Sequence, residues 1–457
     1  MGHTFQHSHL PDPFGSALTQ LTPRLFKFCT KLHYLSSTDW PSDSPVQCAS
    51  RDDVPIKLLQ KGDRESTLWW DTVGKLISLQ LKQARYSETA QEKSLDFFQE
   101  SVLPYMGSFP THDSPRKWKS FMTDDHTPIE LSWDWGNGIK APRIRYSIDP
   151  NSLESGTPKD PTNLHAAKRY YEDVIKRIEG VNTTWHEHFT QCFDTFETSS
   201  RERTGRTSRV FYAFDVRENG DTIPKAYFFP RYLHTPTDPE SSVWNTVTNA
   251  ITSAPFASPD NLQALDVLSS FFKTEPRTTI EMLSIDLLDP KSSRVKIYFR
   301  SRSPDCASIA HNMTLGGRIT DPTHLAGVRN LLNLWRRLFD LSEGEEVGEK
   351  AHETAGVLYY TDFRLGDAMP KIKIYIPVRH FARSDERVVE ALLGHLEESR
   401  ARGENMEAYS EVLRQSFSEK AMREESGVHT YLGCSIAADG SLQLISYINP
   451  QVHKMGV

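Results

Sequence analysis

Basic residues and tyrosines recur at alternate positions in four short segments that resemble β-strands. Residues i and i+2 of a strand point to the same face, so each segment carries a basic face opposite an apolar one. The residues on the basic faces are Arg143, Arg145, Lys225, Tyr227, Arg294, Lys296, Tyr298, Lys371, Lys373 and Tyr375. One such strand would fit a solvated surface. Several strands that repeat Lys-x-Tyr favour a face that lines an enclosed space.

Several cations in one enclosed space require an anionic ligand. A diphosphate fits, because Arg and Lys make strong charge-assisted hydrogen bonds to phosphate oxygens. The sequence contains neither a Walker A loop nor a GxGxxG motif to cradle a nucleotide. The π faces of the neighbouring tyrosines could stabilise a carbocation and keep water away from it. Cations for a departing diphosphate and an aromatic cage for the remaining carbon together predict prenyl transfer.

Prenyl transfer also needs an acceptor molecule, and three residues of the segment PIELSWDW could contact it. Glu130 could accept a hydrogen bond from an N–H or O–H group of an acceptor molecule. The alternative for Glu130 is an exposed carboxylate at a strand end. Trp133 and Trp135 share a strand face, and they either line an acceptor pocket or pack in the core.

Five pairs of strand-like segments alternate with helical segments over about 66–105, 163–196, 243–273, 322–339 and 385–418. Tyr227, Tyr298, Tyr375 and Tyr447 follow one another at spacings of 71, 77 and 72 residues, which indicates an internally repeated architecture. Five antiparallel hairpins could close into one barrel with helices outside, which would remove exposed sheet edges. Ten strands would leave a lumen wide enough for ligands.

Composition narrows the function classes. The 457 residues carry 53 Lys+Arg against 60 Asp+Glu, a net charge of −7, which disfavours nucleic acid and anionic membranes as partners. No apolar run approaches the roughly 18 residues of a membrane helix, and the polar N-terminus does not resemble a secretory signal. The five cysteines form no CxxC pair, which favours a reduced, cytoplasmic protein.

The size alone would suggest about three domains, whereas the repeat favours a single α/β domain over residues 1–457. We expect residues 1–60 to be an N-terminal extension, packed on the barrel or partly mobile.

Several longer strings resemble the fungal dimethylallyltryptophan synthase family of aromatic (indole) prenyltransferases. They are TDDHTPIELSWDW, RIRYSIDP, FDVR with PKAYFFP, SRVKIYFR and PKIKIYIPV, together with the helical WWDTVGKL and FFQESVLPYMG. The resemblance extends over residues 67–447. It implies a ten-stranded antiparallel β-barrel surrounded by helices and built from five α-β-β-α repeats. It also implies transfer of a dimethylallyl group, in some members a longer prenyl group, from its diphosphate to an aromatic acceptor of secondary metabolism.

The resemblance also implies roles for single residues. The diphosphate-binding residues would be Arg145, Lys225, Arg294, Lys296 and Lys373, and the tyrosine shield Tyr227, Tyr298, Tyr375, Tyr431 and Tyr447. Glu130 would be the catalytic residue that binds the indole N–H of the acceptor. No cofactor is required, and magnesium is not obligatory. Asp124-Asp125 is only a fragment of the DDxxD magnesium box, so no metal site is expected there. The partners are then a prenyl diphosphate and an aromatic small molecule, and a homodimer stays open.

Two residues depart from the family pattern. Arg217 stands in FDVR, where members that alkylate free tryptophan carry a lysine thought to remove the final ring proton, and arginine is a poor base. Glu281 stands where those members carry an arginine that holds the substrate carboxylate. Both departures argue against free tryptophan. They favour an indole alkaloid or cyclic dipeptide, with prenylation (dimethylallyl or geranyl) of a phenolic polyketide as the alternative.

Two other functions stay open on the sequence alone. A barrel of this kind could bind a phosphorylated ligand without turnover. It could also be an isoprenoid cyclase or phosphatase that needs no aromatic co-substrate.

Overall fold

The computed structural model describes residues 56–111, 117–193, 208–234, 239–275, 277–352 and 354–452. These residues belong to one compact unit that begins at Val54. The expectation for the N-terminal extension therefore lies outside the described residues for all but its last five positions.

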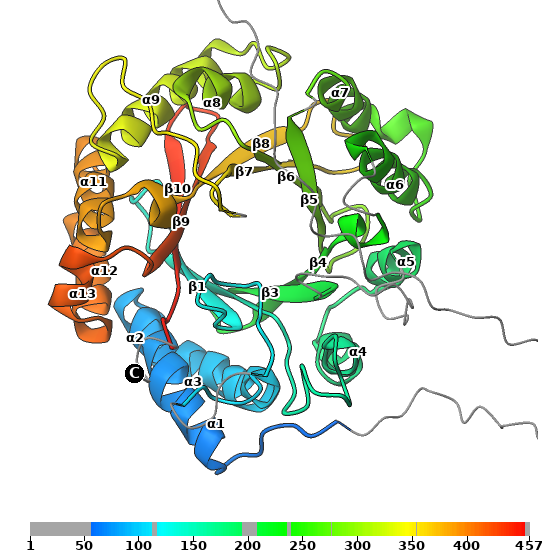
Figure 1. The fold of residues 1–457 in the computed structure, drawn as a ribbon, viewed down its shortest axis with the longest axis vertical. Helices are drawn as coiled ribbons and strands as arrows, with labels where there is room; N and C mark the ends of the chain where they lie inside the picture. The colour runs from blue at the N-terminus through cyan, green and yellow to red at the C-terminus, as the bar shows by residue number, and fades with distance from the viewer. Residues whose placement is uncertain are drawn as a thin grey trace, which may run out of the picture. The chain divides into compact units, whose positions relative to one another are not determined.

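Ten strands form one closed antiparallel barrel, in which every neighbouring pair follows the order of the chain and β1 meets β10. The strands are β1 (Ile129–Gly136), β2 (Arg143–Ile148), β3 (Val210–Val216), β4 (Thr222–Phe228), β5 (Thr278–Asp286), β6 (Val295–Ser301), β7 (Val357–Phe363), β8 (Lys371–Ile376), β9 (His429–Ile436) and β10 (Leu442–Ile448). Figure 1 looks along this barrel. The prediction of five hairpins that close on themselves is confirmed.

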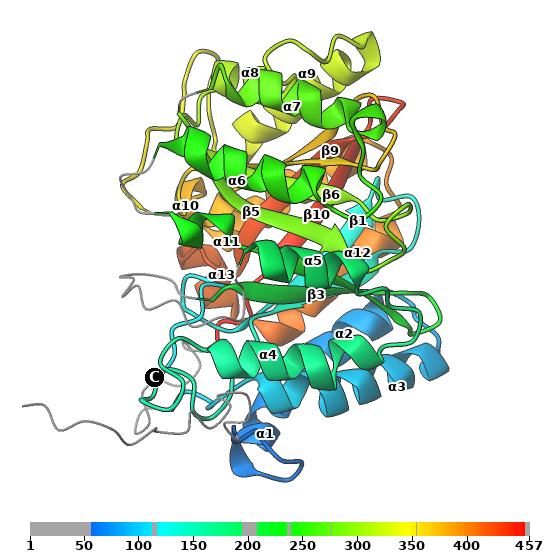
Figure 2. The ribbon, with the colours of Figure 1, turned by 90° about the vertical axis from the view of Figure 1, so that its right-hand side faces the viewer.

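Helices cover the outer face of the strands (Figure 1). The helices are α1 (Arg64–Trp69), α2 (Lys75–Gln83), α3 (Glu88–Phe97), α4 (Leu164–Asp173), α5 (Thr184–Cys192), α6 (Glu240–Thr252), α7 (Gln263–Phe272), α8 (Cys306–Met313), α9 (Pro322–Leu338), α10 (Val378–Phe381), α11 (Asp385–Glu398), α12 (Gly403–Ser416) and α13 (Glu419–Glu424). Figure 2 shows α4, α5, α6 and α7 stacked along one side of the barrel. Within the described part of the chain, no helix has the length and apolar character needed to cross a membrane.

The main hydrophobic core lies between the strands and these helices, because the apolar face of each strand points outward. Trp133 and Trp135 belong to this core, where their rings lie 5.5 and 4.8 Å from the ring of Tyr409 in α12. The indole nitrogen of Trp135 donates to the Ser446 hydroxyl at 3.0 Å. The core alternative for both tryptophans is therefore the correct one, and neither lines the lumen cavity.

Strand register stacks the inward-facing residues in levels. Arg145 pairs with Asp215, Lys225 with Asp286, and Lys296 with Asp362 across adjacent strands. Two residues further along the second strands, Tyr227, Tyr298 and Tyr375 form the next level. Their partners on the neighbouring strands are Ser284, Tyr360 and Leu358, respectively. The basic end of the lumen is thus followed by a level of aromatic rings.

Candidate active site

The lumen contains a cavity of about 240 Å³. Its lining includes all five expected diphosphate-binding residues, Arg145, Lys225, Arg294, Lys296 and Lys373, and four tyrosines of the expected shield, Tyr227, Tyr298, Tyr375 and Tyr447. The structure therefore brings together side chains from five separate hairpins. Glu130 and Tyr431 do not line this cavity and lie beyond the tyrosines.

Aspartates balance four of the five cations. Asp134 accepts from Arg145 at 2.5 Å, and Asp215 accepts from Lys225 at 2.6 Å. Asp286 accepts from both Lys296 at 2.6 Å and Arg294 at 2.8 Å. Sequence reasoning missed these aspartates. Their signal was present, because each lies near the end of the first strand of its hairpin, on the same face as the cations.

Burial and charge act in opposite directions on these groups. Burial alone would raise the pKa of Asp215, but the charges of Arg145 and Lys225 hold it well below its usual range. Burial would also raise the pKa of Asp286, but the charges of Lys296 and Arg294 hold it well below its usual range. Burial lowers the pKa of Lys296 to about 8, although Asp286 opposes this shift. The basic level is therefore an ion-pair network, and an incoming anion must compete with carboxylates.

The tyrosine rings form a connected chain around the lumen. The ring of Tyr298 lies 5.8 Å from that of Tyr227, 5.0 Å from Tyr360 and 6.0 Å from Tyr375. Tyr375 continues the chain to Tyr447 at 5.2 Å and to Tyr431 at 6.0 Å. Tyr360 completes the level and was missed, because VLYYTDF contains two adjacent tyrosines whose faces the sequence could not assign. Several π faces thus border one small space, as a carbocation shelter requires.

Glu130 lies on β1 at the end of the lumen beyond the tyrosines. The Thr430 hydroxyl donates to its carboxylate at 2.6 Å. Burial raises the pKa of Glu130 to about 7, although the Thr430 hydrogen bond and the charge of Arg379 oppose this shift. Glu130 is therefore a hydrogen-bonded carboxyl group inside the barrel, and the alternative of an exposed strand-end carboxylate is wrong. A carboxyl group that titrates near neutral pH can accept a hydrogen bond from an acceptor molecule.

Two arginines whose side chains are buried lie near Tyr431 at the same end. The guanidinium of Arg379 lies 4.7 Å from the Tyr431 ring, and its Nη2 donates to the Tyr431 hydroxyl at 3.3 Å. The Nε atom of Arg300 donates to Glu281 at 3.0 Å. Glu281 is thus not the uncompensated negative charge that the sequence suggested, because Arg300 neutralises it. Neither arginine was recognised from the sequence.

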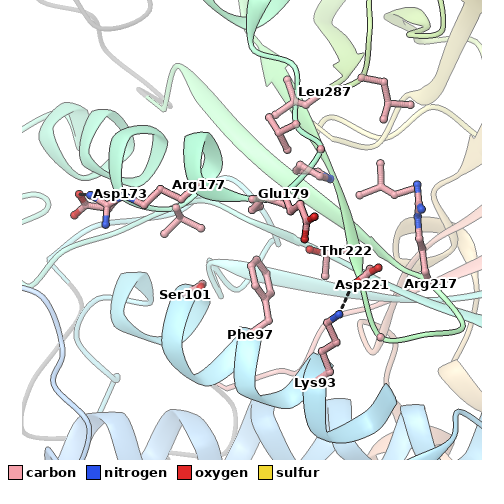
Figure 3. Close-up of a pocket in the computed structure, with 18 residues that line it drawn as sticks. Lys93, Phe97, Ser101, Asp173, Arg177, Glu179, Arg217, Asp221, Thr222 and Leu287 are labelled. Atoms are coloured by element: carbon pink, nitrogen blue, oxygen red, sulfur yellow. Dashed lines mark ion pairs between the residues drawn. The ribbon is translucent and has the colours of Figure 1, made fainter. Parts of the chain in front are cut away.

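Arg217 lies outside the lumen cavity. It follows β3 in the turn to β4, its side chain is exposed, and it borders a different pocket of about 620 Å³ (Figure 3). Lys93 of α3 and Asp221 of the turn, which form an ion pair, also line that pocket. Arg217 is therefore absent from the lining of the cavity that holds the cations and tyrosines. It is also a poor base, because arginine stays protonated at ordinary pH.

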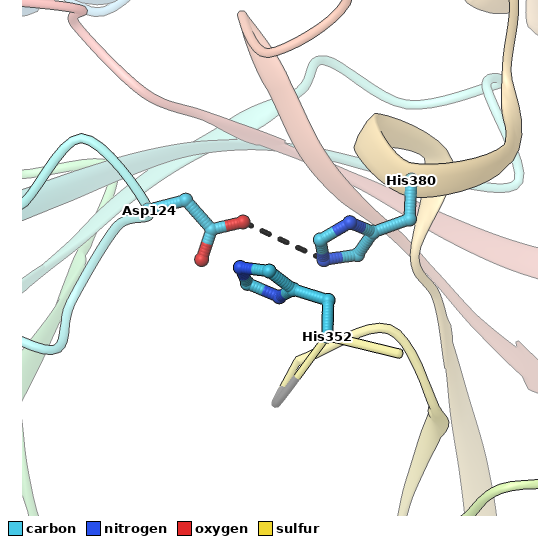
Figure 4. A group of neighbouring side chains, drawn as sticks. All are labelled: Asp124, His352 and His380. Atoms are coloured by element: carbon cyan, nitrogen blue, oxygen red, sulfur yellow. Dashed lines mark ion pairs between the residues drawn. The ribbon is translucent and has the colours of Figure 1, made fainter. Parts of the chain in front are cut away.

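One group of side chains among the described residues has the spacing of metal ligands, namely Asp124, His352 and His380 (Figure 4). Two observations fit a metal ion poorly. The Nε atom of Arg379 lies 2.5 Å from Asp124, so this carboxylate already has a cationic partner. The Thr354 hydroxyl is hydrogen-bonded to all three, at 3.2 Å from Asp124, 2.9 Å from His352 and 2.8 Å from His380. These atoms form a complete polar network that joins two loops to α10.

Comparisons with known proteins agree with this geometry. The family described as tryptophan dimethylallyltransferase matches residues 65–412. The 4-O-dimethylallyl-L-tyrosine synthase of Claviceps purpurea is 31% identical over 84% of this chain and 88% of its own length. The 7-dimethylallyltryptophan synthase of Aspergillus fumigatus is 30% identical over 84% of this chain and 85% of its own. The crystal structure of AnaPT from Neosartorya fischeri has the same fold, with a TM-score of 0.72, 23% identity and coverage of 85% and 94% of the two chains.

Proposed function

The chain belongs to the tryptophan dimethylallyltransferase family and is a prenyltransferase for aromatic acceptors, and on this premise we propose its substrates and the roles of its residues. Dimethylallyl diphosphate is the donor, and an indole alkaloid or cyclic dipeptide of fungal secondary metabolism is the acceptor. The observation that carries the proposal is the sequence of levels in the lumen, from cations through tyrosines to Glu130.

The cations bind the donor by its diphosphate. Arg145, Lys225, Arg294, Lys296 and Lys373 border one cavity. The four of them that are paired with aspartates stabilise the negative charge that develops on the diphosphate as the carbon–oxygen bond breaks. Because these groups are already in place, they need little reorganisation during the reaction. The ion pairs with Asp134, Asp215 and Asp286 hold the cations together until the donor arrives.

The tyrosines shelter the allylic cation. Their rings surround the cavity next to the cations, so the dimethylallyl group of a bound donor lies among π faces and away from water. Tyr227, Tyr298, Tyr375, Tyr431 and Tyr447 have this role, and Tyr360 shares it.

Glu130 orients the acceptor by accepting a hydrogen bond from its N–H or O–H group. The electron-rich ring then attacks the allylic carbon, and a proton is lost. Arg300 and Arg379 are already paired with Glu281 and Asp124. An acceptor carboxylate would have to disrupt one of these pairs, so a neutral acceptor is favoured over a free amino acid.

A phenolic acceptor is the second candidate. Glu130 can accept from a phenol O–H as well as from an indole N–H, and the relative from Claviceps purpurea is named for a product with a prenyl group on a tyrosine oxygen. A phenolic polyketide, with a dimethylallyl or a geranyl donor, therefore remains the alternative.

The reaction needs no obligatory magnesium on this proposal, because lysines and arginines supply the positive charge directly. A divalent ion could still stimulate turnover by association with the free donor.

The test is incubation of the protein with dimethylallyl diphosphate and a panel of indoles, cyclic dipeptides, free aromatic amino acids and phenolic polyketides. Product masses and released diphosphate are both measured. The expected result is diphosphate release that depends on the acceptor, together with a product heavier by one dimethylallyl group. Release without any acceptor would indicate a cyclase or phosphatase. Binding of dimethylallyl diphosphate without diphosphate release in the presence of any acceptor would indicate a ligand-binding barrel.

The same assay is applied to Lys296→Ala, with Lys371→Ala as its matched control. Both lysines lie on inward-facing positions of second strands, but only Lys296 lines the cavity. Loss of turnover is expected for Lys296→Ala and a much smaller effect for Lys371→Ala.

A further inference from the structure

Lys373 differs from the other four cations of the cavity in its partners. Arg145, Lys225, Arg294 and Lys296 each have an aspartate within 2.8 Å. No ion pair of Lys373 occurs among the residues that the structure describes. Its Nζ atom instead lies 5.9, 5.2 and 5.8 Å from the ring centres of Tyr360, Tyr375 and Tyr447.

The side chain of Lys373 also leans out of the basic level. Its backbone is in register with Ser435, whereas the next level up pairs Tyr375 with Gly433. A Cβ atom at Gly433 would lie only 2.9 Å from Cε of Lys373 and 3.1 Å from its Nζ. The amine therefore lies beside Gly433, at the height of the tyrosines, and the missing side chain at position 433 leaves room for it.

Burial and neighbouring charges favour the neutral amine. Burial lowers the pKa of Lys373 to about 7, and the charges of Arg145 and Lys225 act in the same direction. Asp134 and Cys434 oppose this shift. The other ionisable groups around the amine are the phenols of Tyr360, Tyr375 and Tyr447, whose pKa values are raised by burial, so they stay neutral at ordinary pH. A lysine with these surroundings can take up a proton near neutral pH.

We propose that Lys373 is the base that removes the ring proton after the prenyl group has been transferred. The inference rests on the proposed function, since it concerns the last step of that reaction when a ring carbon is prenylated. Attack on the allylic cation leaves the ring carbon with both its hydrogen and the new prenyl group. The Lys373 lone pair takes this hydrogen as a proton, and the electrons of the broken C–H bond restore the aromatic ring.

The product of this step is an ammonium group beside the released diphosphate. That ammonium supplies a counter-ion to the diphosphate, and the proton leaves with the anion when the site empties. Lys373 would thus take over the part for which Arg217 is unsuited, since Arg217 is an arginine and lies outside the cavity.

Lys373→Arg tests the proposal, because arginine keeps the positive charge but cannot act as a base. Its kcat should fall by about 100-fold, within the range known for general bases. The variant should bind the thiolodiphosphate analogue of the donor with an affinity close to that of the unaltered protein. An acceptor deuterated at the reacting ring carbon should then react more slowly than the protonated acceptor, because proton removal has become the slow step.

The pH profile gives an independent readout. A nearby anion favours the charged form of an amine, so a bound diphosphate should raise the pKa of Lys373 above that of the empty site. The kcat of the unaltered protein should therefore rise with pH above neutrality. Lys373→Arg should lose this rise. Lys225→Arg is the matched control, since Lys225 is held by Asp215. Its rate should change without a deuterium effect and without loss of the pH dependence.

Three outcomes would overturn the proposal. The first is a Lys373→Arg variant with unaltered kcat, no deuterium effect and an unaltered pH profile. The second is an equal deuterium effect in Lys225→Arg, which would indicate a general disturbance of the cavity. The third is a deuterium effect in Glu130→Gln but not in Lys373→Arg, which would assign the base to Glu130. Absence of prenyl transfer by the unaltered protein would instead refute the proposed function.

Discussion

Replacement of Glu130 by glutamine should make the protein more stable and less active, and both effects can be worked out from the burial of this carboxyl group. Burial raises the pKa of Glu130 to about 7 from the ordinary 4.5. The folded protein therefore holds the proton more tightly than the unfolded chain does. Below about pH 4.5 the group is protonated in both states and has no effect on stability. As the pH rises toward 7, the unfolded chain releases the proton first, so the free energy of unfolding decreases.

The size of this effect follows from the two pKa values. At roughly 1.4 kcal/mol per pKa unit, the full difference corresponds to about 3 kcal/mol, reached above pH 7. Glutamine has nearly the same shape and no titration. The stability advantage of Glu130→Gln over the unaltered protein should therefore grow by about 2.5 kcal/mol between pH 5 and pH 8. Urea unfolding at both pH values measures this difference, and other titrating groups largely cancel in the comparison.

Catalysis should change in the opposite direction. A hydrogen bond to a charged group contributes about 1.5–3 kcal/mol and one between neutral groups about 1 kcal/mol. Glutamine still accepts a hydrogen bond but carries no charge, so kcat/KM for the acceptor should fall about 2-fold to 30-fold in Glu130→Gln. Binding of a donor analogue should not change, because Glu130 lies beyond the tyrosines. For the unaltered protein, kcat/KM should rise with pH through about 7 as the carboxylate forms.

Thr430→Val provides a control that keeps the carboxyl group. The Thr430 hydroxyl donates to Glu130 and lowers its pKa, so this variant should move the rise in kcat/KM to higher pH. An unchanged acceptor kcat/KM in Glu130→Gln would refute the acceptor role. A stability difference that does not vary with pH would refute the buried, titrating carboxyl group.

Three further predictions concern the two substrates. Arg294→Ala and Lys296→Ala should each weaken binding of a non-hydrolysable donor analogue by about 1.5–3 kcal/mol in calorimetry, and unaltered affinity in both folded variants would remove them from the diphosphate site. Turnover should persist in excess EDTA, and complete loss that only magnesium restores would contradict a mechanism based on lysines and arginines. At equal concentration, a tryptophan-containing cyclic dipeptide should be prenylated faster than free L-tryptophan, because Arg300 and Arg379 are already paired; the highest kcat/KM for tryptophan would show that one of these pairs opens for a carboxylate.

The barrel and most of its basic level could be predicted because both are written in local patterns. Alternation within SRVKIYFR and PKIKIYIPV assigns each side chain to a face, and the recurring tyrosines show that the hairpins are repeats. Both patterns can be interpreted without knowing how distant segments are arranged or how the loops run. The faces of Lys225, Lys296 and Tyr298 follow directly, and all three line the cavity.

The end of the lumen that holds Glu130 could not be predicted in the same way, because it is assembled from segments far apart in the sequence. Arg379 lies on the short helix α10 and contacts both Asp124, from the loop before β1, and Tyr431 of β9. Thr430 reaches Glu130 across 300 residues of sequence. No periodic pattern records such contacts. Trp133 and Trp135 show the converse limit, since alternation put them on one face but only the position of α12 showed that this face is the core.

Glu281 shows why a single departure from a family pattern has to be interpreted with its neighbours. As a lone carboxylate it would repel a substrate carboxylate, and Glu281→Arg would simply restore an anchor. In the structure Glu281 lies at an irregularity between Ile280 and Met282, where it accepts from Arg300. Arg300 is buried and also donates to the carbonyls of Thr354 and Gly356. An arginine at position 281, which is partly buried, would place a second guanidinium group beside the buried one of Arg300, so it would disturb this end of the barrel before it could bind a carboxylate. The proposed preference for a neutral acceptor therefore rests on arginines that are already paired and not on an excess of negative charge.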